Sequence, residues 1–177
     1  MLTGERGLVG NIPQQQATGT PPDGGTGGGP IPWFCVSLQI HAADLDPDEV
    51  AHLLGVVPDR AQRKGVPMPS RGDRPPRVPW IGMWSIDLRP QQAPGCAVEI
   101  AITRVLDRIT VPLDVWHRAR AGARVRIFVS LTLDDGNRGF RLEPALLRRV
   151  ADLGITLDVG IDYGGDDAPR DAGPALP

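Results

Sequence analysis

The chain has 177 residues, of which 41% are hydrophobic, 23% charged and only 5% aromatic. This length suits one domain and is too short for a barrel enzyme of about 250 residues. The formal net charge of -2 disfavours nucleic-acid binding by the whole surface, since that usually needs a strongly positive field. No run of 18 apolar residues and no long apolar N-terminal segment occurs, so we expect no membrane contact and a cytoplasmic location.

The two ends of the chain differ in composition from its middle. Residues 1–32 hold nine glycines, five prolines and no aromatic residue, and residues 164–177 are similar in character. Such segments bury too little apolar surface to offset the entropy of ordering. We predict a disordered Gly/Pro-rich arm over 1–32, or an over-extended start of the reading frame. A single domain over 33–163 and a disordered tail over 164–177 complete the expected organisation.

The first predicted elements are a strand and a capped helix. Apolar and polar residues alternate over 34–41, which is the periodicity of a strand. Asp46 suits a helix N-cap, Pro47 the first helical position and Glu49 the capping-box position, and Gly55 suits the stop. A short extended piece at 56–58 and a long proline-rich loop over about 64–80 follow.

The second half of the chain repeats this alternation of strand and helix patterns. Apolar residues recur at helical spacing after Gly95, and strict alternation over 125–133 predicts the clearest strand in the chain. Pro144 opens a further helix that Gly154 closes. The expected elements are a strand over 83–88, helices over 98–109 and 112–119, a strand over 125–133, a turn over 134–139, a helix over 144–153 and a strand over 155–161.

These patterns predict the fold class. Each predicted strand is apolar on one face and polar or mixed on the other, whereas strands buried on both faces would be apolar throughout. We therefore expect an α+β fold in which a twisted mixed sheet of about four strands carries helices packed mainly on one face. The order of the strands is not readable from the sequence.

Several short motifs occur in an order typical of a known family. They are Asp46-Pro47-Asp48-Glu49, Leu54-Gly55-Val56 with Pro58, Lys64-Gly65, Gly82-Met83-Trp84, Leu153-Gly154-Ile155, Leu157-Asp158 and Asp162-Tyr163. Over about 34–163 the chain resembles the bacterial proteins grouped as domain of unknown function 4279. The resemblance implies a small single-domain bacterial protein and supplies no catalytic residues.

Basic residues concentrate between Arg60 and Arg77. This stretch holds six basic residues against one acidic residue, Asp73, for a net charge of +5. Guanidinium groups match carboxylates and phosphates, so a docking surface is one interpretation, and a solvated loop neutralised by acidic segments is the other. Trp80 follows the loop and is expected to be an exposed anchor, whereas Trp84 is expected in the core. The candidate binding surface consists of Arg60, Arg63, Lys64, Arg71, Arg74, Arg77 and Trp80.

Familiar catalytic and metal-binding patterns are missing. Cys35 and Cys96 fit neither a zinc motif nor a redox pair, and Cys35 is expected to be buried as a small hydrophobic residue. The acidic residues and histidines near Asp46 lack a recognised ligand spacing, so we expect no metal and no cofactor. An unrecognised hydrolase would need His41 or His52 to meet Asp158 or Asp162.

Three functions therefore remain open. The first is a non-catalytic protein-binding module, of the kind that serves as an immunity-type partner, which docks a partner with an acidic surface through the basic loop and Trp80. The second is a nucleotide or nucleic-acid binder that uses the arginine-rich loop. The third is the hydrolase, and we favour a non-enzyme because no catalytic motif is present.

Overall fold

The computed structural model of the chain describes residues 31, 33–69, 75–89, 97–133 and 138–163. The predicted arm, the predicted tail and most of the predicted turn at 134–139 lie outside these residues. The elements in chain order are β1 (Trp33–Ala42), α1 (Pro47–Leu54), β2 (Arg60–Gln62), β3 (Gly82–Leu88), α2 (Val98–Asp107), α3 (Leu113–Ala119), β4 (Arg124–Leu133), α4 (Pro144–Asp152) and β5 (Thr156–Tyr163).

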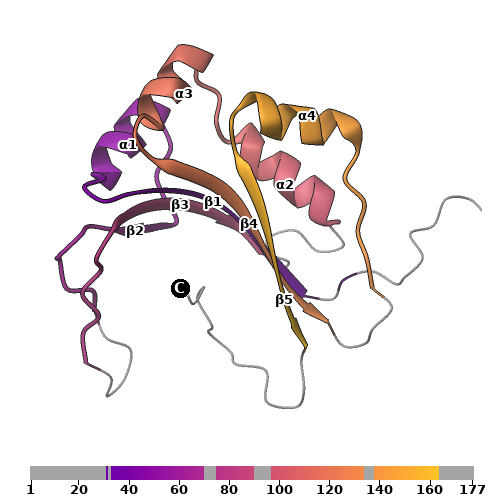
Figure 1. Cartoon of the computed structure of the whole chain (residues 1–177), viewed down its shortest axis with the longest axis horizontal. Coiled ribbons are helices and arrows are strands. Elements are labelled where there is room, and N and C mark those ends of the chain that lie inside the picture. Colours follow the sequence, from indigo (N-terminus) through magenta and orange to yellow (C-terminus); the bar gives the residue numbers. More distant parts are fainter. Residues whose placement is uncertain (1–30, 32, 70–74, 90–96, 134–137, 164–177) are drawn as a thin grey trace, which may run out of the picture.

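The five strands form one mixed sheet in the order β2-β3-β1-β4-β5. Neighbouring strands are antiparallel except β4 and β5, which are parallel and are joined through α4. The sheet is arched, and Figure 1 shows α1, α2, α3 and α4 on one side of it. The α+β fold with helices on one face is thus confirmed, with five strands rather than about four.

The core lies between this sheet and the helices. Val36, Leu38 and Ile40 of β1 are fully buried, as is Trp84 of β3, which confirms the expected core position of Trp84. Every second residue of β4 is buried in the same way, because successive side chains of a strand point to opposite faces. Burial of this apolar face is the main favourable term for the fold.

Local residue chemistry sets the ends of α1. The backbone N–H of Asp48 donates to Oδ1 of Asp46 at 2.9 Å, and Pro47 occupies the first turn. Gly55 ends the helix with a positive φ of 63°, a conformation that costs glycine little. The predicted N-cap and stop are confirmed.

Two features near the sheet differ from the predictions. The strand β2 at Arg60–Gln62, where Ala61 pairs with Trp84 of β3, was not predicted, and residues 56–58 belong to no strand. A strand of three residues owes its position to its partner rather than to its own pattern. Cys35 points away from the core and is only half-buried, with its Sγ 3.8 Å from Oγ of Ser37.

Candidate functional site

The predicted long loop folds back on itself beside β2 and β3. The N–H of Gly65 donates to the carbonyl of Pro79 at 2.7 Å, and the N–H of Met68 donates to the carbonyl of Arg77 at 2.9 Å. Residues 64–69 and 75–79 therefore form the two arms of a structure that we call the hairpin. Arg71 and Arg74 of the predicted surface fall between these two segments in the sequence and are outside the described residues.

Arg60 does not face outward as a free cation. It reaches over the helix-free face of the sheet, where its Nε lies 2.7 Å from Oδ2 of Asp87 and its Nη2 donates to Oδ1 at 3.0 Å. The same Nη2 donates to Oγ of Ser37 at 3.2 Å, and Ser85 Oγ donates to Asp87 at 2.7 Å. Burial alone would raise the pKa of Asp87, but the bonds from Arg60 and Ser85 outweigh it and lower that pKa.

Arg63 and Lys64 are also engaged by carboxylates. Arg63 forms ion pairs with Asp46, at 2.7 Å, and with Asp48, both at the start of α1. The ammonium of Lys64 lies 3.0 Å from Oδ1 of Asp44. Three of the predicted basic residues thus neutralise acidic groups of the same chain, which is the alternative interpretation that the sequence left open.

Arg77 and Trp80 are placed differently. Arg77 is exposed and makes no ion pair in the part of the chain that the structure describes. Trp80 exposes 64% of its surface, and Val66 and Val78 of the hairpin expose 52% and 55%. The two valines were not singled out in the sequence, although each precedes a proline in a loop, where an apolar side chain has little core to join. Among the described residues, this part of the surface therefore combines exposed apolar side chains with one cation, Arg77, that forms no ion pair.

Polar side chains gather on the helix-free face of the sheet. His41 Nε2 lies 3.1 Å from Oε1 of Gln39, which also accepts from Nε of Arg126 at 2.9 Å. Arg126 in turn pairs with Asp158 at 3.2 Å and lies 5.2 Å from the ring centroid of Phe128. His41 and Asp158 share a face but bond to Gln39 and Arg126 rather than to each other.

The field on this face changes the protonation of His41. Burial first, then the charges of Arg126 and Arg124, lowers the pKa of His41 to about 4. A carbonyl oxygen can only accept, so the neutral ring carries its proton on Nε2 and donates it to Gln39. That proton forms the hydrogen bond to Gln39. An imidazole with so low a pKa is also a weak base near neutral pH.

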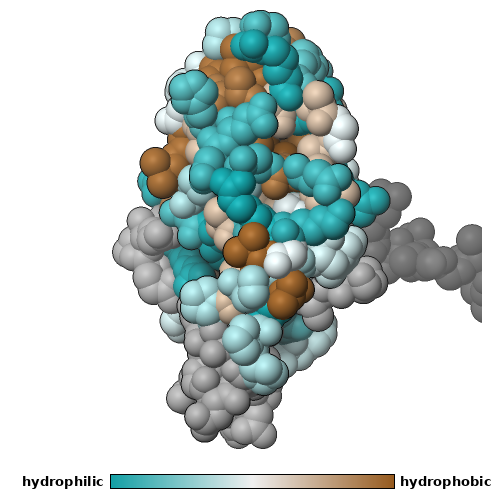
Figure 2. Space-filling view, turned by 90° about the vertical axis from the view of Figure 1, so that its left-hand side faces the viewer, coloured by the Kyte–Doolittle hydropathy of each residue, from teal (hydrophilic) through white to brown (hydrophobic). Residues whose placement is uncertain are grey.

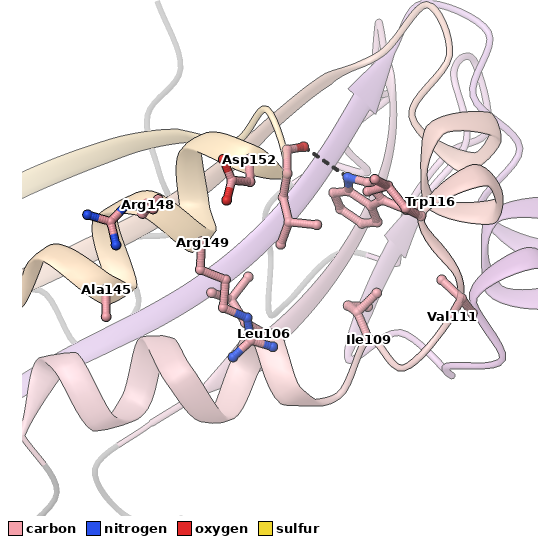
Figure 3. Close-up of a pocket in the computed structure, with 10 residues that line it drawn as sticks. Leu106, Ile109, Val111, Trp116, Ala145, Arg148, Arg149 and Asp152 are labelled. Atoms are coloured by element: carbon pink, nitrogen blue, oxygen red, sulfur yellow. Dashed lines mark hydrogen bonds between the residues drawn. The ribbon is translucent and has the colours of Figure 1, made fainter.

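A cavity of about 420 Å³ lies between α2, α3 and α4. Figure 3 shows Trp116 at one end of it, with its indole Nε1 donating to the carbonyl of Leu153 at 2.9 Å. Arg149 of α4 forms an ion pair with Asp107 of α2 at 2.7 Å. Arg148 and Asp152 are the other charged lining residues and have opposite signs.

The described residues offer little for a metal or a membrane span. No group of three or more histidine, cysteine, aspartate or glutamate side chains within them is placed to hold a metal ion. None of the helices in the described ranges is long and apolar enough to cross a bilayer.

The family model for Domain of unknown function (DUF4279) matches residues 32–164. The chain belongs to this family. The match spans β1 to β5, so the DUF4279 domain coincides with the sheet, its helices and the hairpin. Neither a curated protein nor a solved structure matches the chain.

Proposed function

We propose that this DUF4279 domain is a non-catalytic protein-binding module that docks its partner through the hairpin and Trp80. The carrying observation is the exposure of Val66, Val78 and Trp80, each by more than half of its surface. Tryptophan and arginine are enriched among the residues that contribute most of the binding energy at protein interfaces. We include an immunity-type role and a cytoplasmic location in bacteria in the same proposal. The free thiol of Cys35 supports only the location, because free thiols suit a reducing compartment.

The chemistry of the surface suggests the chemistry of the partner. Figure 2 views the side of α1, β2 and the hairpin, and its brown apolar patches are small and separated by hydrophilic surface. A small apolar contact within a polar rim is the usual anatomy of a transient interface. Arg77 adds a positive charge that no acidic group of the described residues pairs, so we expect the partner to offer an apolar pocket beside an acidic group.

The ion pairs favour this function over nucleic-acid binding. A nucleic-acid surface needs several cations free to replace the counterions of the phosphates. Arg60, Arg63 and Lys64 are paired with Asp87, Asp46, Asp48 and Asp44, so Arg77 alone of the described predicted cations is free for such contacts.

The experiment compares the full chain with its Trp80→Ser variant. Both are immobilised and exposed to nuclease-treated extract of the source cells. A photo-crosslinking residue at the exposed position 76 of the hairpin, which leaves Trp80 in place, identifies the protein that contacts it. We expect one protein to be cross-linked and its affinity to fall roughly 30-fold in the variant, the loss typical of a central interface aromatic residue. Ile100→Ser is the matched control, because Ile100 is 47% exposed on α2 and away from the hairpin.

Two outcomes would reject the proposal. One is retention of the same protein with equal affinity by Trp80→Ser, which would show that Trp80 does not anchor the interface. The other is cross-linking of nucleic acid, and of no protein, by position 76 in untreated extract. Reversing the charges of Arg60, Arg63 and Lys64 is a poorer test, because each new glutamate would face an aspartate of the same chain.

A further inference from the structure

The two edges of the sheet are built differently. At one edge β2 has only three residues, and at the other β5 runs for eight residues, Thr156–Tyr163, with β4 as its neighbour. An unpaired edge strand presents a row of N–H and C=O groups that can pair with another strand. Short edge strands limit this risk, and β5 is not short. Within the described residues no strand pairs with the outer edge of β5, so this edge can pair with a strand of another chain.

The face of β5 turned toward the helices is apolar but uncovered. In the parallel register with β4, Val159 lies beside Val129, and Ile161 lies beside Leu131, both of which are buried. Val159 is nevertheless 44% exposed, Ile161 53% and Tyr163 72%. Figure 1 shows α4 above only the upper part of β5. The apolar face of the sheet thus continues past the core to the free edge.

The other face of β5 is acidic and partly fixed. Asp158 forms an ion pair with Arg126 of β4 at 3.2 Å. Its charge is therefore partly neutralised and repels an approaching strand less. Gly160 lies under the ring of Phe128, whose Cζ would be 3.0 Å from an added Cβ. Asp162 is exposed, and no ion pair of this residue occurs among the described residues.

We propose that β5 pairs antiparallel with β5 of a second copy of this chain, about a two-fold axis at Val159. In this register Leu157 lies opposite Ile161 of the second copy, so the apolar face is continuous across the axis. Asp158 lies opposite Gly160, and Asp162 opposite Thr156, which neighbours Arg126 in the register with β4. The acidic groups of each copy therefore approach small or basic-flanked positions of the other.

Other self-pairing registers are less favourable. An axis at Gly160 would set Asp158 directly opposite Asp162 twice, and like charges directly opposite destabilise a ladder. An axis at Ile161 would pair only 159–163 within the strand. An axis between two residues would place apolar side chains opposite polar ones, because opposite residues share a face of the sheet. The sequence Thr156-Leu157-Asp158-Val159-Gly160-Ile161-Asp162 is thus complementary to itself only about Val159.

The first experiment measures the mass of the full chain in solution by light scattering and sedimentation. We expect a dimer, and we expect Val159→Lys to weaken it roughly tenfold or more, since two ammonium groups would meet at the axis. Ile100→Lys is the matched control, because it adds the same charge to an exposed apolar residue on α2 and should leave the dimer intact. A wild-type chain that stays monomeric at high concentration would overturn the proposal, and would leave β5 for a strand of another protein.

The second experiment tests the register. In a background with Cys35 and Cys96 replaced by serine, Val159→Cys should oxidise to a covalent dimer, since residues directly opposite in a ladder lie about 4.5–5.5 Å apart at Cα. Ile161→Cys should not, because the two copies of residue 161 would be about 13 Å apart along the strands. Equal cross-linking of both variants, or of neither, would contradict the pairing about Val159. Failure here leaves the hairpin proposal untouched, because Trp80 is tested separately.

Discussion

At the scale of single residues, we expect His41 to make the stability of the fold depend on pH. Its pKa is lowered to about 4 by burial and by Arg126 and Arg124, while an unfolded histidine has a pKa of about 6.5. Between these two pH values His41 is protonated in the unfolded chain but neutral in the folded chain. The free energy of unfolding therefore falls as the pH drops from about 6.5 to about 4. Through His41, the free energy of unfolding of the wild-type chain should fall by about 2–3 kcal/mol across this pH range.

The His41→Gln variant checks this effect. Glutamine keeps a donor for Gln39 and cannot titrate, so the variant should lack that share of the slope. Urea unfolding at several pH values between 4 and 7.5 gives the free energy of unfolding of each chain. His52→Gln, on the exposed side of α1, is the matched control. Identical slopes for wild type and His41→Gln would show that His41 is not the source.

Single residues also show where sequence reasoning reaches its limit. The basic cluster and the exposed Trp80 were readable, because composition and loop position are local properties. The carboxylate partners were not, because Arg60 meets Asp87 only through the pairing of β2 with β3. Which segments lie side by side depends on strand order, and alternation within one strand carries no information about its neighbour.

At the scale of elements, Gly82 lies where β3 begins, beside β1 and the residues that precede α1. It pairs with Ala42 at the start of β3, and an added Cβ would lie within 2.9 Å of Cβ of Leu45 and still closer to the Leu45 carbonyl. Backbone cannot move aside as a flexible side chain can. We expect Gly82→Ala to lower the free energy of unfolding by about 2–3 kcal/mol.

Gly139→Ala is the control for this prediction. Gly139 has no atom within 4 Å of an added Cβ, so its substitution should change the free energy of unfolding by less than about 0.5 kcal/mol. Chemical denaturation of both variants separates crowding at Gly82 from the general effect of removing a glycine. Equal stabilities of the two variants would mean that the junction at Leu45 relaxes freely.

Elements with strong local signals were predicted well. The ends of α1 follow from Asp46, Pro47 and Gly55, which act within one turn, and the alternation of β4 follows from burial of one face. The strand β2 was not predicted, because three residues are too few to show a periodicity. The parallel pairing of β4 with β5 was also unreadable, since it depends on the path of the chain through α4 rather than on either strand.

At the scale of the whole molecule, the core is self-contained within the DUF4279 match. The buried apolar side chains of the described residues all lie between Phe34 and Ile155, and the family model covers 32–164. A chain cut to 31–164 should therefore unfold cooperatively, with a thermal midpoint within about 2 °C of that of the full chain. For a domain of this size, a loss of about 1 kcal/mol in the free energy of unfolding would lower the midpoint by roughly 3–6 °C. Scanning calorimetry of both chains at equal concentration measures this midpoint.

The concentrations must be equal because dimerisation through β5 would also raise the midpoint. A midpoint more than about 5 °C lower in the shortened chain, with the dimer mass unchanged, would mean that residues outside 31–164 stabilise the domain directly.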